Sequence, residues 1–201
     1  MHCGRRGDPG GLRSGRLEYA RRVNTDVVVF NGGSSSGTTT LARALQGMLD
    51  EAWLLLGVDD LVDALPQRGA GAAATIAFPP DGSVVVGPVF MRVQEAWTAG
   101  VAAIARAGVG VLVDDVFLGG GASQARLAAA LGGLDVLWVG VRCDAHVAAA
   151  REARRGDRVT GMAVAQAEAV HHGVRYDVEV DTSRASPEDC AREVLAVLSA
   201  R

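Results

Sequence analysis

Residues 26–41 read "DVVVFNGGSSSGTTTL", and this stretch sets the expectation for the whole fold. Positions 27–30 are all apolar, as expected of a strand buried on both faces. Positions 32–39 then fit G-x-x-x-x-G-[K]-[ST], the pattern of a phosphate-binding loop, everywhere except at one fixed position. Thr38 stands where the pattern has lysine. The stretch predicts a buried strand, a phosphate loop and a helix, with the usual cation missing from the loop.

The residue types in this loop suit phosphate. Gly32 and Gly37 permit backbone conformations that other residues avoid, and successive N–H groups can then converge on an anion. The following helix adds its positive end, and the hydroxyl after the lysine position, Thr39, would bind Mg²⁺. A tight strand-to-helix turn with Ser and Thr as caps is the alternative reading of the loop alone. The predicted nucleotide-binding residues are Gly32, Gly33, Ser34, Ser35, Ser36, Gly37, Thr38, Thr39 and Thr40.

Thr38 removes a charge that normally reaches the terminal phosphates of a nucleotide, although it keeps a hydroxyl donor. Losing a positioned donor to transition-state charge typically costs on the order of 100- to 1000-fold in rate. The chain contains no lysine at all, since its 20 basic residues are all arginine. Backbone amides, Mg²⁺ and arginines would remain, so we expect nucleotide binding to survive better than turnover.

Length and composition narrow the function classes. The chain has 201 residues, 49% of them hydrophobic, which suits one domain with a substantial core. A formal net charge of −3 does not favour nucleic-acid binding. No apolar run reaches the roughly 18 residues of a membrane span, and the first residues lack the apolar segment of a secretory signal, so we expect a cytoplasmic protein. The three cysteines show no C-x-x-C spacing, which argues against a disulfide framework or a zinc site.

The chain after the loop alternates strand and helix patterns. Such alternation predicts an α/β fold, a parallel sheet with helices on both faces, and ligands on such sheets bind at the carboxyl ends of the strands. We expect one domain over residues 26–201, preceded by a Gly- and Arg-rich, flexible extension at 1–25. Further strands are expected at 53–59, 109–115, 134–144 and 176–183, a hairpin at 75–86, and helices at 89–107, 122–131, 145–153, 162–170 and 186–199.

Two acidic positions lie where predicted strands end. Asp59 stands at the end of "WLLLGVD", where a carboxylate could accept a proton from an attacking hydroxyl. The alternative is that Asp60 is the N-cap of the next helix and Asp59 is merely its exposed neighbour. Asp114 ends the apolar run in "VLVDD", the pattern of an aspartate that holds Mg²⁺ through water, although many buried strands end in aspartate.

An Arg-rich stretch, "REARRGDR" at 151–158, straddles a glycine between two predicted helices. A mobile lid that carries Arg151, Arg155 and Arg158 could close on phosphates, because the guanidinium fork matches phosphate oxygens. A solvated helix end, with arginines favourably placed near the helix C-terminus, is an equally good reading of this stretch taken alone.

Together these features resemble chloramphenicol phosphotransferase and its close relatives among the P-loop kinases. The resemblance spans about residues 26–198 and rests on several long strings rather than on one motif. They are "NGGSSSG" at 31–37, "GVDDLVDALP" at 57–66, "DDVFLGG" at 114–120, "DVLWVGVRCD" at 135–144, "RGDRVTGMA" at 155–163 and "YDVEVDTS" at 176–183. The departure is Thr38, where the family pattern has lysine.

The resemblance implies a P-loop kinase-like fold with a five-stranded parallel sheet and an arginine lid. It implies transfer of the γ-phosphate of ATP to a hydroxyl of a small antibiotic, with Asp59 as general base and Thr39 on Mg²⁺. The lid arginines fall in the 151–158 stretch, and the family's second acidic pair falls at 114–115. The segment "FPPDGSVVVGPVF" and the helix after it are expected to line the acceptor pocket.

The leading hypothesis is an ATP- and Mg²⁺-dependent phosphotransferase that acts on a small hydroxylated natural product, without nucleic-acid or membrane partners. The oligomeric state, including a homo-oligomer, stays open. An alternative keeps the scaffold but abandons ATP, and Asp59 then performs acid–base chemistry on a biosynthetic intermediate, such as a cyclisation, dehydration or hydrolysis. A nucleotide- or ligand-binding regulator is a third hypothesis, and an engineered Thr38 is a fourth.

Overall fold

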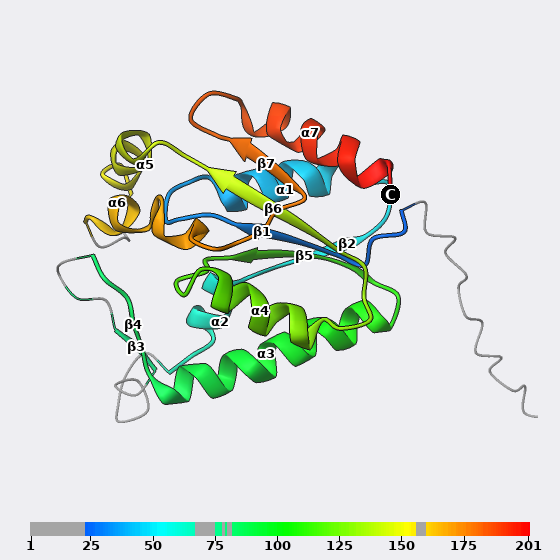
Figure 1. Cartoon of the computed structure of the whole chain (residues 1–201), viewed down its shortest axis with the longest axis horizontal. Helices are drawn as coiled ribbons and strands as arrows, with labels where there is room; N and C mark the ends of the chain where they lie inside the picture. The colour runs from blue at the N-terminus through cyan, green and yellow to red at the C-terminus, as the bar shows by residue number, and fades with distance from the viewer. Residues whose placement is uncertain (1–22, 67–74, 78, 80–81, 156–159) are drawn as a thin grey trace, which may run out of the picture.

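Five parallel strands form the central sheet of the computed structural model, in the order β2-β5-β1-β6-β7. The strands are β1 (Val27–Asn31), β2 (Trp53–Gly57), β5 (Gly110–Asp115), β6 (Val136–Arg142) and β7 (Val178–Asp181). β1 lies in the middle of the sheet and is buried along its whole length, because helices cover both faces (Figure 1). The predicted α/β fold is confirmed, and β7, where a strand was expected at 176–183, lies at one edge of the sheet.

The structure describes residues 23–66, 75–77, 79, 82–155 and 160–201. Most of the expected N-terminal extension and Arg158 lie outside these ranges. The last residues of the expected extension, however, belong to the packed domain. Thr25 is buried and its hydroxyl donates to Asp135 Oδ1 at 3.1 Å, while Val23 packs against the hydrophobic core. The domain therefore begins before the predicted boundary at residue 26.

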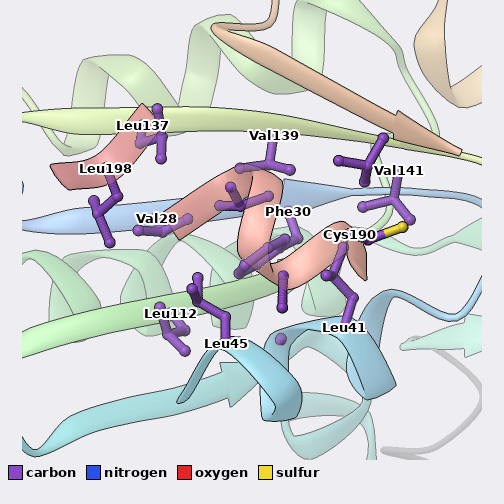
Figure 2. Packing of buried hydrophobic residues seen from close by; sticks show 14 of the residues in the cluster. Val28, Phe30, Leu41, Leu45, Leu112, Leu137, Val139, Val141, Cys190 and Leu198 are labelled. Carbon is purple, nitrogen blue, oxygen red and sulfur yellow. The ribbon is translucent and has the colours of Figure 1, made fainter. Parts of the chain in front are cut away.

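One face of the sheet is covered by α1 (Thr38–Met48) and α7 (Pro187–Ser199) (Figure 1). Val28 and Phe30 of β1 are fully buried on this face. Figure 2 shows the core that forms here, with side chains from the sheet and from both helices in contact. It labels Val28, Phe30, Leu41, Leu45, Leu112, Leu137, Val139, Val141, Cys190 and Leu198.

The other face is covered by α3 (Pro88–Arg106) and α4 (Gly121–Ala130) (Figure 1). Val27 and Val29 belong to the core on this face, since successive side chains of a strand point to opposite sides. Phe117, two residues after β5, is buried in the same core. The two cores explain why the sequence of β1 is continuously apolar.

One predicted helix is wrong in its extent. The pattern at 162–170 folds as a short helix, α6 (Met162–Gln166), followed by a 3₁₀ turn (Ala169–His171). The Val170 carbonyl accepts a hydrogen bond from Asn31 Nδ2 on β1 at 2.9 Å. The 3₁₀ turn thus contacts β1, whereas the predicted helix would have continued to residue 170.

The carboxyl ends of the strands meet at one edge of the sheet, on the left of Figure 1. Around this edge lie α2 (Val58–Asp63), α5 (Ala145–Glu152) and α6, together with the small hairpin of β3 (Ile76–Ala77) and β4 (Val85–Val86). The predicted hairpin at 75–86 is thereby confirmed as an antiparallel pair. Among the described residues, no helix combines the length and the apolar character that crossing a bilayer requires.

Candidate active site

A cavity of about 830 Å³ lies at the carboxyl ends of the strands. Residues 33–40 form one end of it, with the carboxylates of Asp59, Asp114 and Asp115 nearby. The other end is formed by α2, the hairpin and α3, which contribute two kinds of side chain. The polar ones are Asp63, Gln94, Glu95 and Thr98, and the apolar ones, which predominate, are Val58, Val62, Ile76, Val84, Val86, Phe90 and Met91. The cavity therefore combines a polar end that suits phosphate with a mainly apolar end that suits an organic molecule.

The loop between β1 and α1 has a shape that depends on its glycines. Gly37 adopts a left-handed conformation with φ of 91°, where most side chains would be strained. A Cβ at Gly32 would lie 2.5 Å from Ser36 Oγ, so that position has no room for a side chain. The side-chain oxygens of Ser34 and Ser35 line the cavity and are buried without a hydrogen-bond partner in the described part of the chain. The loop thus offers polar groups to a ligand, together with the N–H groups at the start of α1.

Thr38 occupies the first position of α1 and is buried, with 7% of its surface exposed. Its hydroxyl forms a hydrogen bond with Ser36 Oγ, at a distance of 2.7 Å. A lysine at this position would extend several bonds further and carry a positive charge. The Thr38 side chain is neutral and engaged within the loop, so the loop has no side-chain cation of its own.

Thr39 and Asp114 form the pair that the sequence assigned to metal binding. Thr39 Oγ1 donates a hydrogen bond to Asp114 Oδ2 at 2.6 Å, because β1 and β5 are parallel neighbours and end at the same edge. Hydroxyl and carboxylate oxygens are ligands that Mg²⁺ prefers. Within the described ranges, no group of three or more His, Cys, Asp or Glu residues could hold a metal ion. The pair fits Mg²⁺ if water and phosphate supply its remaining ligands.

The two carboxyl groups at the end of β5 are difficult to ionise. Burial raises the pKa of Asp114 to about 6, against the hydrogen bond from Thr39, and the charges of Asp59 and Asp115 raise it further. Burial also raises the pKa of Asp115 to about 6, although the nearby Arg126 charge opposes this effect. A divalent cation would relieve both the desolvation and the repulsion, which makes this end of the cavity receptive to Mg²⁺.

The structure separates the roles of two neighbouring aspartates. α2 begins at Val58, and Asp60 Oδ2 accepts a hydrogen bond from the Gly57 N–H at 2.7 Å. Asp60 therefore caps the helix from within its first turn and is not the N-cap residue, because the helix begins earlier than that reading expected. Asp59 is exposed and lines the cavity. A carboxylate that lines a cavity can accept a proton from a hydroxyl bound there.

The arginines of the predicted lid lie in different places. Arg155 is exposed and lines the cavity. Arg151 lies on α5 and contacts the loop instead: its Nη1 donates to the Ser36 carbonyl at 3.2 Å, and its Nη2 donates to the Thr182 carbonyl at 2.7 Å. Arg158 is outside the described residues. One predicted lid arginine is thus at the cavity, and another is bound to the loop from a side that does not line the cavity.

Several polar cavity residues had no signal in the sequence, among them Arg126 on α4 and Gln166 on α6. Gln166 Oε1 accepts a hydrogen bond from the Ser34 N–H at 2.8 Å, which connects α6 to the phosphate loop. Gly33 permits this approach, because a Cβ there would lie 3.1 Å from Gln166 Cβ. Arg126 Nη2 donates to Ser123 Oγ at 3.0 Å. Neither residue belongs to a motif, and only the packing of the helices brings them to the cavity.

Comparison with known proteins agrees with this geometry. The sequence model of the family described as "Chloramphenicol phosphotransferase-like protein" matches residues 25–199. The protein named "Putative O-phosphotransferase Rv2636", from Mycobacterium tuberculosis, is 32% identical over 183 residues, and the match covers 84% of this chain and 80% of that protein.

Solved structures share the fold. A sugar kinase from Janibacter sp. superposes with a TM-score of 0.63 at 19% identity, over 87% of this chain and 94% of the kinase. The tunicamycin resistance protein of Deinococcus radiodurans gives a TM-score of 0.58 at 18% identity, over 86% of this chain and 94% of that protein. With nearly the whole domain matched by one family and a phosphate loop at the expected edge of the sheet, this chain belongs to the chloramphenicol phosphotransferase-like family and is a phosphotransferase with a P-loop kinase fold.

Proposed function

We propose that this phosphotransferase moves the γ-phosphoryl group of MgATP to a hydroxyl of a small natural product, such as an antibiotic, in the cytoplasm. The observation that carries the proposal is that the phosphate loop, Asp59 and the Thr39–Asp114 pair all line one cavity with an apolar end. Phosphoryl transfer depends mainly on positioning and on electrostatic stabilisation, which such an arrangement supplies.

The acceptor hydroxyl would lie between Asp59 and the γ-phosphate. Asp59 accepts the hydroxyl proton while the acceptor oxygen bonds to phosphorus, and the bond to the bridging oxygen breaks to release ADP. The loop N–H groups hold the phosphates, and Arg155 offsets part of their charge. Mg²⁺, held by Thr39 and Asp114, would neutralise further charge on the phosphate oxygens.

The apolar end of the cavity supports an organic acceptor. Val86 of the hairpin and Phe90 and Met91 of α3 line it, and they belong to the segment and helix from which the sequence predicted an acceptor pocket. Ile76, which lies outside that segment, lines it as well. Contacts of this kind select by shape and apolar surface and carry little information on one compound. The names of the family and of the tunicamycin resistance protein support an antibiotic as the acceptor.

Calorimetric titration tests the nucleotide half of the proposal. We expect MgATP and a non-hydrolysable analogue to bind, and a panel of hydroxylated antibiotics incubated with MgATP to yield a product heavier by one phosphoryl group in mass spectrometry. The absence of any nucleotide binding at millimolar concentration would overturn the proposal.

Thr38→Lys tests whether the loop still performs phosphoryl transfer. Because the new ammonium group would contact the transferred phosphate, we expect the rate to rise on the order of 100-fold. Gly47→Lys is a matched control, since it adds the same charge to an open position of the same helix. An unchanged rate with Thr38→Lys, in a protein that still folds, would mean that the loop has another use.

One observation favours a second candidate function. Thr38 is neutral, and its hydroxyl is hydrogen-bonded to Ser36. The loop therefore lacks a side-chain cation for ATP chemistry. An enzyme that had abandoned ATP could keep the cavity and use Asp59 for acid–base chemistry on a biosynthetic intermediate. This candidate predicts that MgATP does not bind and that Thr38→Lys leaves turnover unchanged.

A further inference from the structure

We infer that Arg151 is a positioning residue that acts on the phosphate site through a backbone peptide of the loop. By polarising this peptide, it replaces part of the electrostatic effect of the missing lysine. The inference rests on the proposed ATP-dependent function. It begins from the position of Arg151, which contacts the phosphate loop from behind and does not line the cavity.

The Arg151 guanidinium is held by partners from several elements. Its Nη1 lies 3.2 Å from the Ser36 carbonyl oxygen, 3.3 Å from Thr182 Oγ1 and 3.5 Å from Cys143 Sγ, and its Nη2 lies 2.7 Å from the Thr182 carbonyl oxygen. The described residues include no carboxylate paired with Arg151. Its positive charge is therefore fixed in place, and no acid within the described ranges neutralises it.

The Ser36 carbonyl receives two hydrogen bonds. Besides Arg151, the buried Thr182 hydroxyl donates to the same oxygen at 2.5 Å. A Cβ on Gly37 would lie 3.5 Å from Arg151 Nη1, so the guanidinium is in contact with the loop at this peptide. Arg151 and Thr182 thus act together on the bond between residues 36 and 37.

A trans peptide connects this carbonyl to the opposite side of the loop. No cis peptide occurs in the described chain, so the Gly37 N–H points away from the Ser36 carbonyl. In a phosphate loop the N–H groups point inward to the anion. A cation on the carbonyl polarises the peptide and strengthens the opposite N–H as a donor, because hydrogen bonds in a chain reinforce one another in a medium of low dielectric. Arg151 therefore acts on the phosphate without touching it.

Calorimetric titration of the full-length chain with MgATP tests the inference. We expect Arg151→Gln to weaken MgATP binding about tenfold, the size of one charge-assisted hydrogen bond. Thr182→Val, which removes the second donor to Ser36, should weaken it less. Arg154→Gln is the matched control, because Arg154 is exposed and lies three positions further along the chain. Its side chain makes no contact with the loop among the described residues. Its loss should therefore change MgATP binding less than twofold.

The Thr38→Lys background separates charge delivery from a structural role. If Arg151 substitutes for the missing lysine, restoring lysine should reduce the effect of Arg151→Gln from about tenfold to about twofold. An equal loss in both backgrounds would overturn the inference, because it would show that Arg151 only supports the loop structure. Equal binding by Arg151→Gln and the unaltered protein would also overturn it.

Two controls keep the outcome interpretable. If Arg151→Gln does not fold, Arg151→Lys is used instead, because it keeps the charge but loses the second hydrogen bond. The inference would be contradicted if Arg151→Lys left MgATP affinity unchanged in the unaltered background but lowered it in the Thr38→Lys background. Failure of the proposed function has a different signature, since the unaltered protein would then bind no MgATP in any titration.

Discussion

The two ends of the cavity are built in different ways. At the phosphate end, short side chains and backbone groups are held by hydrogen bonds, such as Thr39 to Asp114 at 2.6 Å and Ser34 to Gln166 at 2.8 Å. The acceptor end is formed mainly by apolar side chains on α2, on α3 and on a hairpin whose strands have two residues each. Where charge develops during phosphoryl transfer, small displacements are costly. Where only shape is recognised, sequence can vary. Substitutions at the two ends should therefore affect different kinetic constants.

Asp59→Asn should give the largest effect, because it removes the proposed base and leaves the shape of the site intact. We expect kcat to fall on the order of 100- to 10,000-fold, with MgATP affinity changed little. Asp63→Asn is the matched control, since Asp63 lies one turn along the same helix and also lines the cavity. An equal fall in kcat for both variants would show that total charge, and not a base at position 59, supports turnover.

Asp114→Asn should give the next largest effect. It removes the carboxylate of the predicted Mg²⁺ pair, and we expect a loss on the order of 100-fold in kcat/KM, together with loss of the Mg²⁺ requirement for ATP binding. Titration of ATP with and without Mg²⁺ measures this directly. A variant that still needed Mg²⁺ at the same concentration would exclude Asp114 as a ligand.

The pH dependence of stability sharpens the same point. The pKa of the Asp114 carboxyl is raised to about 6, so between its ordinary value and about 6 the folded protein binds more protons than the unfolded chain. The contribution of Asp114 to the free energy of unfolding is therefore present at low pH and is lost as the pH rises through about 6. MgATP needs the ionised form, so the thermal stabilisation that it gives should be larger at about pH 7.5 than at about pH 5. A larger MgATP shift at the lower pH would contradict this.

Met91→Ala tests the acceptor end and should give the smallest effect. Removing this apolar surface should raise KM for the acceptor on the order of tenfold and leave MgATP affinity unchanged, because Met91 lines the cavity from α3 and does not belong to the phosphate loop. Met48→Ala, the same substitution on α1 outside the cavity, controls for general loss of packing. An equal change in nucleotide affinity would show that the two ends do not act separately.

Local sequence predicted much of the fold. The start of α7 follows from Ser186, whose hydroxyl accepts from the Asp189 N–H at 3.1 Å, and from Pro187 at the first helical position. The extent of α6 was not predicted in this way, and the 3₁₀ turn that follows it forms a hydrogen bond to Asn31, a residue far away in the chain. Patterns within one segment do not contain such contacts.

In the candidate site, too, some features could be predicted from local sequence and others depended on contacts between distant residues. The sequence alone placed the phosphate loop, because glycine spacing and a buried strand are local properties, and it pointed to Asp59 and Asp114, because both follow apolar runs. Only the tertiary structure showed that Asp60 caps α2 and that Asp59 lines the cavity. Only the tertiary structure showed that Arg151, predicted as a lid residue, donates a hydrogen bond to the Ser36 carbonyl of the loop. Residue type and spacing determine which chemistry is available to a chain, whereas the direction in which each group acts depends on helices that meet only after folding.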